Sequence, residues 1–363
     1  MPPSSLPADR LVCAIMAGGS GTRFWPLSRK REPKQLLQFF GDKSLLRITV
    51  DRIAPLCPPE RRLCVTALHL RDAVANVLPE LQPSQILCEP APRNTAPCMA
   101  IAAIVAQQLA PDAILVLLPS DHFVADAEAF RAALLQAAVH ADAGHIVTLG
   151  VQPTTPETGY GYIELAADLG QQTFDVARFV EKPNLQTAEQ YLLGGQHLWN
   201  AGVFVLRADK ALASLDAHVP EIGQALADLR VPSLPYNSPE FTETLQRTFP
   251  NCPNVSIDYG VAEHEPSIRC VKLNAGWSDV GTWHSVLGLR GDGELNFTSG
   301  PVLAVDSHHN VLISNGPLLA AIGLSDMAVV ATEDATLVLP LDRSQDVRLV
   351  VAELTKLGRG DLL

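Results

Sequence analysis

The chain has 363 residues, of which 47% are hydrophobic and 18% charged, and its formal net charge is −12 at pH 7. This length and composition predict a well-packed protein with one large domain or two unequal ones. The acidic balance excludes a broad basic surface of the kind that binds nucleic acid, but leaves room for a local basic site. No apolar run reaches the ~18 residues of a membrane-spanning helix, so we expect a cytoplasmic protein without membrane contact.

Seven cysteines are spread along the chain without any C-x-x-C pair. Such cysteines are usually reduced and buried at apolar positions, as Cys13, Cys64 and Cys270 are expected to be. The sequence therefore predicts no zinc site.

Short apolar strands alternate with helices in the first part of the chain. The expected strands are Leu11–Met16, Leu63–Ala67, Ile86–Cys88 and Ala113–Leu118, and the expected helices are Leu45–Leu56, Leu70–Leu81 and Ala96–Leu109. The last of these strands is apolar throughout, as in a sheet with both faces covered. The pattern predicts an α/β fold with a Rossmann-like, doubly wound mixed sheet, which binds ligands at the carboxyl ends of its strands.

A glycine-rich loop, Met16–Ser28, follows the first predicted strand and contains Gly18, Gly19 and Gly21. Backbone N–H groups of such a loop approach phosphate oxygens closely, which makes it a candidate cradle for a nucleoside triphosphate. It lacks the Gly-Lys-Ser/Thr ending of a Walker loop, and Phe24 occupies the place of the third glycine of the dinucleotide fingerprint. A tight surface turn is the alternative interpretation.

Basic residues are concentrated in this loop and just after it. They are Arg23, Arg29, Lys30, Arg31 and Lys34. In a chain with a net charge of −12, this concentration beside a glycine-rich loop favours a polyphosphate ligand. The alternative is a solvated charged face.

The C-terminal part of the chain has a different spacing of predicted elements. After Gly291–Gly293, short strand-like pieces recur with turn residues between them, and a helix is expected at Gln345–Leu354. The pieces are Val302–Val305, Asn310–Ser314, Leu318–Ile322, Ala328–Ala331 and Leu337–Leu339. Such spacing predicts β-helix turns or a small sandwich.

The loop from Ala17 to Ser28, followed by Glu32–Gln35, resembles the signature of the sugar-phosphate nucleotidylyltransferases. The sequence of Arg23–Ser28 is most similar to that of the mannose-1-phosphate guanylyltransferases. Further motifs resemble that family and follow in its order. They are Glu89-Pro90, Arg93–Pro97, Leu118–His122, Gly159–Ile163, Phe179–Pro183, Trp199–Gly202, Ser256–Tyr259 and Gly276–Gly281.

The resemblance covers the length of the chain and implies a nucleotidyltransferase, GT-A-like fold. Residues 1–290 would form the catalytic domain and residues 291–363 a short left-handed β-helix-like domain. The catalytic domain would include a sugar-recognition half. This half would contain the extended pieces Tyr160–Leu165 and Val176–Val180, which the helix Gln186–Leu193 separates from later elements. Because this type of C-terminal domain commonly contributes to self-association in the family, the resemblance also implies a homodimer.

The implied reaction transfers GMP from GTP to α-D-mannose 1-phosphate and gives GDP-mannose and pyrophosphate. A phosphate nucleophile is already ionised at neutral pH, so catalysis would need positioning and charge neutralisation rather than a general base. By resemblance, Arg23 would neutralise the leaving pyrophosphate, Lys34 would hold the nucleotide phosphates, and Lys182 would hold the sugar 1-phosphate.

Two aspartates are candidate ligands of Mg²⁺. Asp121 follows an apolar strand at the expected ligand edge of the sheet, and Asp279 lies far away in the sequence between Trp277 and Gly281. Mg²⁺ is commonly held by one or two carboxylates together with phosphate oxygens and water. The family's metal aspartates correspond to both positions, whereas the alternative for Asp121 is an N-cap or turn carboxylate.

The resemblance also implies the residues that contact the two substrates. The expected nucleotide contacts are Ala17, Gly18, Gly19, Gly21, Thr22, Arg23, Glu89, Asn94, Thr95, Pro119 and Asp121. The expected sugar contacts are Gly161, Glu181, Lys182, Asn200 and Asp258.

Structural alternatives exist for several of these residues. Glu89 is placed to accept from the N–H groups of guanine, but it could equally stabilise its loop. Glu181 and Lys182 could pair only with each other, Asn200 could cap a turn, and Gly161 could serve a hairpin bend.

Three functional hypotheses follow. The leading hypothesis is the guanylyltransferase. The second is a uridylyl- or thymidylyltransferase acting on glucose 1-phosphate. The sequence of Arg23–Ser28 disfavours this second hypothesis. The third is a noncatalytic sugar-nucleotide sensor, which could have lost Asp121 and Asp279 without losing ligand binding.

Overall fold

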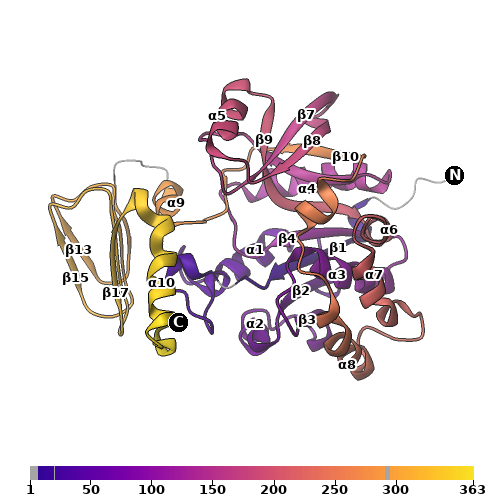
Figure 1. The fold of residues 1–363 in the computed structure, drawn as a ribbon, viewed down its shortest axis with the longest axis horizontal. Helices are drawn as coiled ribbons and strands as arrows, with labels where there is room; N and C mark the ends of the chain where they lie inside the picture. The colour runs from indigo at the N-terminus through magenta and orange to yellow at the C-terminus, as the bar shows by residue number, and fades with distance from the viewer. Residues whose placement is uncertain (1–6, 20, 291–294) are drawn as a thin grey trace. The chain divides into compact units, whose positions relative to one another are not determined.

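The computed structural model describes residues 7–19, 21–290 and 295–363. The chain divides into two compact units, whose elements are labelled in Figure 1. Unit 1 comprises Met1–Gly18, Val50–Ser120 and Val124–Trp277, and unit 2 comprises Gly19–Thr49, Asp121–Phe123 and Ser278–Leu363. Gly291–Gly293, beside the expected domain boundary, lie outside the described residues.

Unit 1 contains a nine-stranded mixed sheet of order β3-β2-β1-β4-β9-β6-β10-β8-β7. Its strands are β1 (Leu11–Ala17), β2 (Arg62–Ala67), β3 (Ile86–Glu89), β4 (Ile114–Pro119), β6 (Ile146–Val151), β7 (Gly161–Gly170), β8 (Thr173–Glu181), β9 (His197–Arg207) and β10 (Ile268–Leu273). Strands β1 to β4 are parallel, as are β6 and β10, whereas β9 is antiparallel to β4, β6 and β7. The predicted mixed α/β sheet is confirmed.

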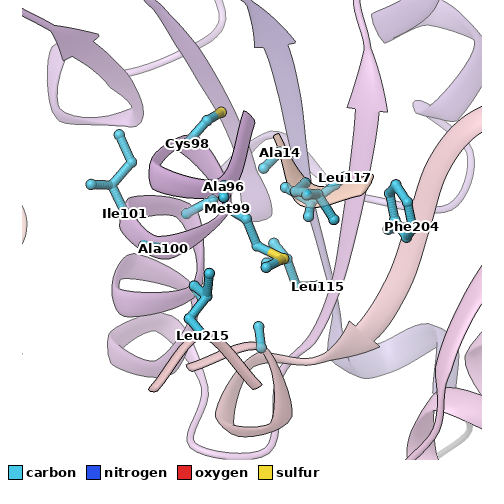
Figure 2. Close-up of a cluster of buried hydrophobic side chains, with 14 of the residues drawn as sticks. Ala14, Ala96, Cys98, Met99, Ala100, Ile101, Leu115, Leu117, Phe204 and Leu215 are labelled. Carbon is cyan, nitrogen blue, oxygen red and sulfur yellow. The ribbon is translucent and has the colours of Figure 1, made fainter. Parts of the chain in front are cut away.

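The helices of unit 1 pack on this sheet or on one another. They are α2 (Arg71–Val77), α3 (Thr95–Leu109), α4 (Ala127–Asp142), α5 (Leu185–Gly194), α6 (Ala208–His218), α7 (Pro220–Ala225) and α8 (Pro239–Thr248). Helix α3 is almost wholly buried, and Figure 2 shows Met99 pointing from it toward Leu115 of β4. Helix α4 packs against β4, β6, β9 and β10, and its buried residues lie outside the α3 cluster. The central strands are therefore covered on both faces.

The two early helices are shorter than expected. Helix α1 (Leu45–Ile53), along which the chain passes from unit 2 to unit 1, ends two residues before Pro55. Helix α2 ends at Val77, two residues before Pro79. The residue before a proline is disfavoured in helical conformation, so each proline ends its helix early. The predicted ends at Leu56 and Leu81 were wrong for this reason.

The C-terminal part of unit 2 consists of short, mostly parallel strands. They are β12 (Phe297–Ser299), β13 (Val302–Val305), β14 (Val311–Ser314), β15 (Leu319–Ile322), β16 (Met327–Ala331) and β17 (Thr336–Pro340), accompanied by α9 (Trp283–Leu287) and α10 (Val347–Lys356). Strand β14 is parallel to β12 and β16, and β13 is parallel to β15. Parallel pairing of alternate strands is typical of a β-helix and disfavours the antiparallel sandwich.

The glycine-rich loop shares a hydrophobic core with these C-terminal strands inside unit 2. Phe24 lies edge-on to Trp283, with ring centroids 4.8 Å apart, and to Phe39 at 5.1 Å. The same core includes Trp25 from the loop and Phe297 from β12. Aromatic packing from segments far apart in the sequence therefore supports the loop.

Two short strands, β5 (Phe123–Val124) and β11 (Trp277–Ser278), occur where the chain passes between the units. All seven cysteines are buried and none is in a disulfide, as predicted. No described helix is both long and apolar enough to cross a membrane.

Candidate active site

Three candidate nucleotide contacts lie at the carboxyl ends of parallel strands in unit 1. Ala17, Glu89 and Pro119 are the last residues of β1, β3 and β4. Since β1, β2, β3 and β4 are parallel, their carboxyl ends meet at one edge of the sheet. This edge is where open α/β sheets bind their ligands.

The Glu89 carboxyl group lies beside the start of the glycine-rich loop. A side chain on Gly18 would begin 3.0 Å from Glu89 Oε2. The other oxygen, Oε1, is buried and has no hydrogen-bond partner among the described residues. Burial raises the pKa of Glu89 to about 7. An unsatisfied buried acceptor next to the loop is suited to a ligand that donates hydrogen bonds.

Asn94 and Thr95 have local structural roles at the start of α3. Asn94 has a left-handed backbone with φ of 66° and is the N-cap residue, whose side chain accepts from Thr95 N at 2.9 Å. Thr95 Oγ1 accepts from Ile257 N at 2.9 Å, next to Asp258 in the sequence. These contacts fix the turn that the sequence associated with the nucleotide.

A lysine and two aspartates come together in unit 2, and we call Lys34, Asp121 and Asp279 the lysine cluster. Lys34 Nζ donates to Asp121 Oδ2 at 2.8 Å and to the backbone oxygen of Asp279 at 2.6 Å. Lys34 is 6% exposed. A buried ammonium needs such partners because leaving it unpaired is costly. Three segments far apart in the sequence therefore meet at one cation.

The Asp121 carboxyl group favours its ionised form in this cluster. Burial opposes ionisation, but the charges of Lys34 and His122 outweigh it and hold the pKa of Asp121 below its usual value. The N-cap alternative for Asp121 is wrong, because Asp126 caps α4 by accepting from Glu128 N and Ala129 N. Asp121 does lie in a turn, as the other alternative expected.

The glycine-rich loop is bent tightly around Lys34. Gly21 has φ of 60°, and a side chain there would begin 2.5 Å from Lys34 Cβ, so only glycine fits. Ser28 Oγ donates to Gly21 O at 2.7 Å, and Gln35 Nε2 donates to Gly19 O at 3.1 Å. These bonds hold the loop backbone in unit 2.

The loop cations are used in different ways. Thr22 and Arg23 are exposed, and Arg23 forms no hydrogen bond or ion pair within the described part of the chain. Arg29 instead donates to Pro26 O at 2.8 Å and to Leu362 O, and it pairs with Asp334. Arg29 therefore stabilises unit 2, and Arg23 keeps its charge available to a ligand.

Glu181 and Lys182 lie at the end of β8 in unit 1. Glu181 is paired in register with Gly161 of β7, and a side chain on Gly161 would begin 2.6 Å from Glu181 Oε2. Lys182 has a left-handed backbone with φ of 49° and forms an ion pair with Glu181. Its side chain is 54% exposed, whereas that of Glu181 is 7% exposed. The pairing predicted as an alternative is present, and it still leaves the ammonium accessible.

Asn200 and Asp258 join these residues to form what we call the sugar-side cluster: Glu181, Lys182, Asn200 and Asp258. Asn200 Nδ2 donates to Asp258 Oδ1 at 2.9 Å, and Asn200 Oδ1 accepts from Gly202 N at 3.1 Å. Burial raises the pKa of Asp258 to about 6, the charge of Glu181 acts in the same direction, and Lys182 opposes them. Asp258 begins a π-helical turn (Asp258–Ala262), a feature frequent at functional sites.

Two further residues belong to this region and were missed by sequence reasoning. Thr148, fully buried in β6, donates to Asn200 Oδ1 at 2.7 Å. Glu263 Oε1 accepts from Glu181 N at 3.1 Å. Neither has a sequence signal, because a threonine within a strand and a glutamate after a helical turn are ordinary at those places.

The described residues contain no group of three or more histidine, cysteine, aspartate or glutamate side chains arranged for a metal ion. The lysine cluster nevertheless offers two carboxylates, with Asp279 Oδ1 accepting from Gly281 N at 2.9 Å. Two hard oxygen donors fit an ion that takes its remaining ligands from phosphate and water.

Two families match the chain. The nucleotidyl transferase family matches residues 12–292, and the MannoseP isomerase/GMP-like beta-helix domain matches residues 300–354. The second match agrees with the parallel strand pairs of unit 2.

Similar proteins cover almost the whole chain. The xanthan biosynthesis protein XanB of Xanthomonas campestris pv. campestris (strain B100) is 41% identical over 96% of this chain and 74% of its own length. The mannose-1-phosphate guanylyltransferase of Escherichia coli (strain K12) is 38% identical over 97% of this chain and 75% of its own. The crystal structure of mannose-1-phosphate geranyltransferase from Thermus thermophilus superposes with a TM-score of 0.86 at 34% identity, over 95% of this chain and 99% of that one.

Proposed function

Because the chain belongs to the nucleotidyl transferase family, we propose that it transfers GMP from GTP to α-D-mannose 1-phosphate and releases pyrophosphate. The motif resemblance is confirmed by that membership, and the names of the relatives support the choice of substrates. The observation that carries the proposal is the lysine cluster. The buried ammonium binds the Asp121 carboxylate and the backbone oxygen of Asp279, so a cation and two aspartates from separate segments lie together, which supports binding of a nucleotide polyphosphate and a metal ion.

The proposed chemistry is an in-line displacement. A phosphate oxygen of mannose 1-phosphate attacks the α-phosphorus of GTP, the new P–O bond forms, and the bond to pyrophosphate breaks. Lys34 holds the nucleotide phosphates, and Lys182 holds the phosphate of the sugar. The exposed Arg23 neutralises the charge that develops on pyrophosphate. The nucleophile is already ionised, so this chemistry needs no general base.

Asp121 and Asp279 are the residues proposed to hold Mg²⁺. Both contribute hard carboxylate oxygens, and the pKa of Asp121 is held low, so that carboxylate is ready to bind a cation. When bound, the ion neutralises phosphate charge and orients the phosphates for displacement. Lys34 bonds the Asp121 carboxylate and the Asp279 backbone oxygen, and thereby holds together the two segments that carry these aspartates.

Guanine recognition is assigned to Glu89, with Ala17, Gly18 and Pro119 forming the adjacent backbone edge. Guanine presents N1–H and N2–H₂ donors, which match the buried Oε1 that has no partner among the described residues. Adenine lacks this pattern and would leave the carboxylate unsatisfied, at a cost of about 1–3 kcal/mol. GTP is therefore expected to be preferred over ATP.

The sugar-side cluster is assigned to mannose 1-phosphate. Glu181 accepts from sugar hydroxyls, Asn200 donates its second Nδ2 proton, and Asp258 completes the polar edge. Gly161 leaves the space in which the Glu181 carboxylate lies. These polar groups supply orientation, and the exposed Lys182 ammonium supplies charge for the phosphate.

A homodimer is proposed through the β-helix part of unit 2. Strands β13 and β15 expose Leu303 at 54%, Val305 at 43% and Ile322 at 74%, an apolar face unusual for a surface. Leu303→Glu combined with Ile322→Glu should convert the dimer to a monomer in sedimentation velocity. A wild-type monomer at all concentrations would contradict this proposal.

Pyrophosphate release tests the proposed function. The purified protein is incubated with Mg²⁺ and a matrix of common nucleoside triphosphates against the 1-phosphates of mannose, glucose and N-acetylglucosamine. Release only with GTP and mannose 1-phosphate is the expected result. Another active pair would keep the mechanism and overturn the substrates, and no release with any pair would favour the sensor hypothesis.

A further inference from the structure

Thr148 lies at an irregularity of the sheet in unit 1. In the pairing of β6 with β9, Thr148 is opposite Phe204 and Gly150 is opposite Asn200, so Ala201–Val203 oppose only Leu149. Gly202 within the bulge has φ of 66°. Bulges of this kind redirect a side chain beside an active site. Here the redirected residue is Asn200, which reaches Asp258 of another segment.

The Thr148 hydroxyl group is buried inside this bulge. It lies 2.7 Å from Asn200 Oδ1 and 3.1 Å from Val203 O, and Thr148 has no exposed surface. A hydroxyl has a single proton, so it is shared between two acceptors of which Asn200 Oδ1 is the nearer. The hydroxyl therefore connects both ends of the bulge.

These contacts decide which way the Asn200 amide faces. Gly202 N donates to Oδ1 and the Asp258 carboxyl group accepts from the other amide atom, so Oδ1 is the oxygen, and the Thr148 hydroxyl donates to it as a second partner. The nitrogen then faces Asp258 and donates one proton at 2.9 Å. A reversed amide would set its N–H₂ group against the Gly202 N–H and its oxygen against the Asp258 carboxyl group, and it could no longer accept from the Thr148 hydroxyl.

We propose that Thr148 is a positioning residue for sugar recognition, because its buried hydroxyl fixes the Asn200 amide so that Nδ2 presents a donor beside Asp258. This inference rests on the proposed function, since it deepens the assignment of Asn200 and Asp258 to the sugar 1-phosphate. Thr148 itself does not contact the substrate. It acts through Asn200, which is only 9% exposed and has little freedom once its oxygen is held.

Two variants that each remove one group of the threonine side chain test this role. Thr148→Val removes the hydroxyl and keeps the shape, whereas Thr148→Ser keeps the hydroxyl and removes a methyl group. Thr148→Val is expected to raise the KM for mannose 1-phosphate about tenfold, the effect of one lost buried hydrogen bond, with the KM for GTP changed less than about twofold. Thr148→Ser is expected to stay within about threefold of wild type for both.

A matched control separates positioning from packing. Thr173 of β8 is also fully buried, and its hydroxyl accepts from Gln136 at 3.3 Å, away from Asn200 and Asp258. Thr173→Val is expected to lower the melting temperature by a few degrees, as Thr148→Val does, without changing the KM for the sugar. Equal KM values in Thr148→Val and wild type would overturn the proposal. So would equal impairment of Thr148→Val and Thr148→Ser, because the lost packing would then be the cause.

A double-variant comparison tests whether Thr148 acts through Asn200. In an Asn200→Ala background, Thr148→Val should change the KM for the sugar less than about twofold, because the amide it positions is gone. A further tenfold increase would show an independent effect and overturn the proposal. If Thr148→Val does not fold, Thr148→Ala replaces it, since it also lacks the hydroxyl and adds no bulk.

Different measurements would contradict the proposed function and this inference. Wild-type turnover across the substrate matrix reports the function, and the KM series is measured with whichever sugar 1-phosphate is active. If wild type is inactive with every pair, the positioning role is tested by NMR instead. The side-chain amide signal of Asn200 is identified in the ¹H–¹⁵N spectrum as the one that Asn200→Ala lacks. Thr148→Val should shift this signal and speed its exchange with solvent, and an unchanged signal overturns the positioning role.

Discussion

The lysine cluster of unit 2 and the sugar-side cluster of unit 1 place a partly buried aspartate in opposite surroundings. Asp121 lies against the Lys34 ammonium, and its pKa is lowered despite burial. Asp258 lies near Glu181 and Glu263, and its pKa is raised to about 6 although Lys182 opposes the shift. The difference indicates that the neighbouring charge, and not burial alone, sets the direction in which the pKa of a partly buried carboxyl group shifts. One cluster is suited to cations and phosphates, the other to neutral hydroxyls.

Removing the cation of the lysine cluster should have the largest effect. Lys34→Met keeps the aliphatic length but leaves Asp121 and the Asp279 carbonyl without their donor, and we expect kcat to fall about 10³-fold. The measurement is pyrophosphate release at saturating GTP and mannose 1-phosphate. Lys30→Met, an exposed cation of the same loop, is the control and should keep wild-type turnover. A loss of less than about tenfold in Lys34→Met would contradict the role of this cluster.

Removing the exposed charge of Arg23 should have the second largest effect on kcat. Arg23→Ala is expected to lower kcat by about 10²-fold while the KM for mannose 1-phosphate stays nearly constant, because the role proposed for Arg23 is to neutralise pyrophosphate and not to bind the sugar. Single-turnover and steady-state kinetics measure both quantities. Arg31→Ala removes a neighbouring exposed charge and serves as the control. Unaltered turnover in Arg23→Ala would rule out the assigned role.

A smaller effect is expected from the titration of Glu89. Burial raises its pKa to about 7, so the carboxyl is mostly protonated below that pH and mostly ionised above it. Only the ionised form accepts fully from both guanine donors. The KM for GTP of wild type, divided by that of Glu89→Gln, should therefore fall up to about tenfold as pH rises from about 6 to about 8. The ratio cancels the titration of GTP itself, and a ratio independent of pH would count against guanine recognition by Glu89.

The smallest effect is expected at Asp258. With a pKa of about 6, raised by burial and by Glu181, Asp258 is mostly protonated at about pH 5 and mostly ionised at about pH 7.5. Asp258→Asn imitates the uncharged form, so both proteins should have the same KM for mannose 1-phosphate at the lower pH. At the higher pH the variant should differ by about threefold. Equal values at both pH values would show that the charge of Asp258 does not affect sugar binding.

Local sequence signals predicted much of the fold. The glycine-rich loop follows β1 as expected, and Gly21 adopts the left-handed backbone that its residue type permits. The apolar strand before Asp121 is buried on both faces. The predicted helix ends were wrong at α1 and α2, where a proline two residues later outweighs the apolar periodicity.

The candidate site was only partly predictable. Arg23 and Arg29 look equivalent in a cluster of cations, yet Arg29 is bound to Asp334 and Leu362 within unit 2. Thr148 has no signal of its own, because its partner Asn200 lies on another strand at a bulge that periodicity does not reveal. Motif resemblance identified residue types and their order, but the hydrogen bonds between them depend on backbone positions distant in sequence.

The sequence by itself determined the family, the alternation of strands and helices, and the residues able to carry phosphate chemistry, because these depend on residue type, spacing and short-range backbone preference. Only the tertiary structure decided that Lys34 bonds Asp121 and Asp279, that Glu89 keeps a buried oxygen without a partner among the described residues, and that Asp121 and Asp258 have opposite pKa shifts. Hydrogen bonding and pKa depend on the distance and burial of groups brought together by folding, which spacing along a chain does not contain.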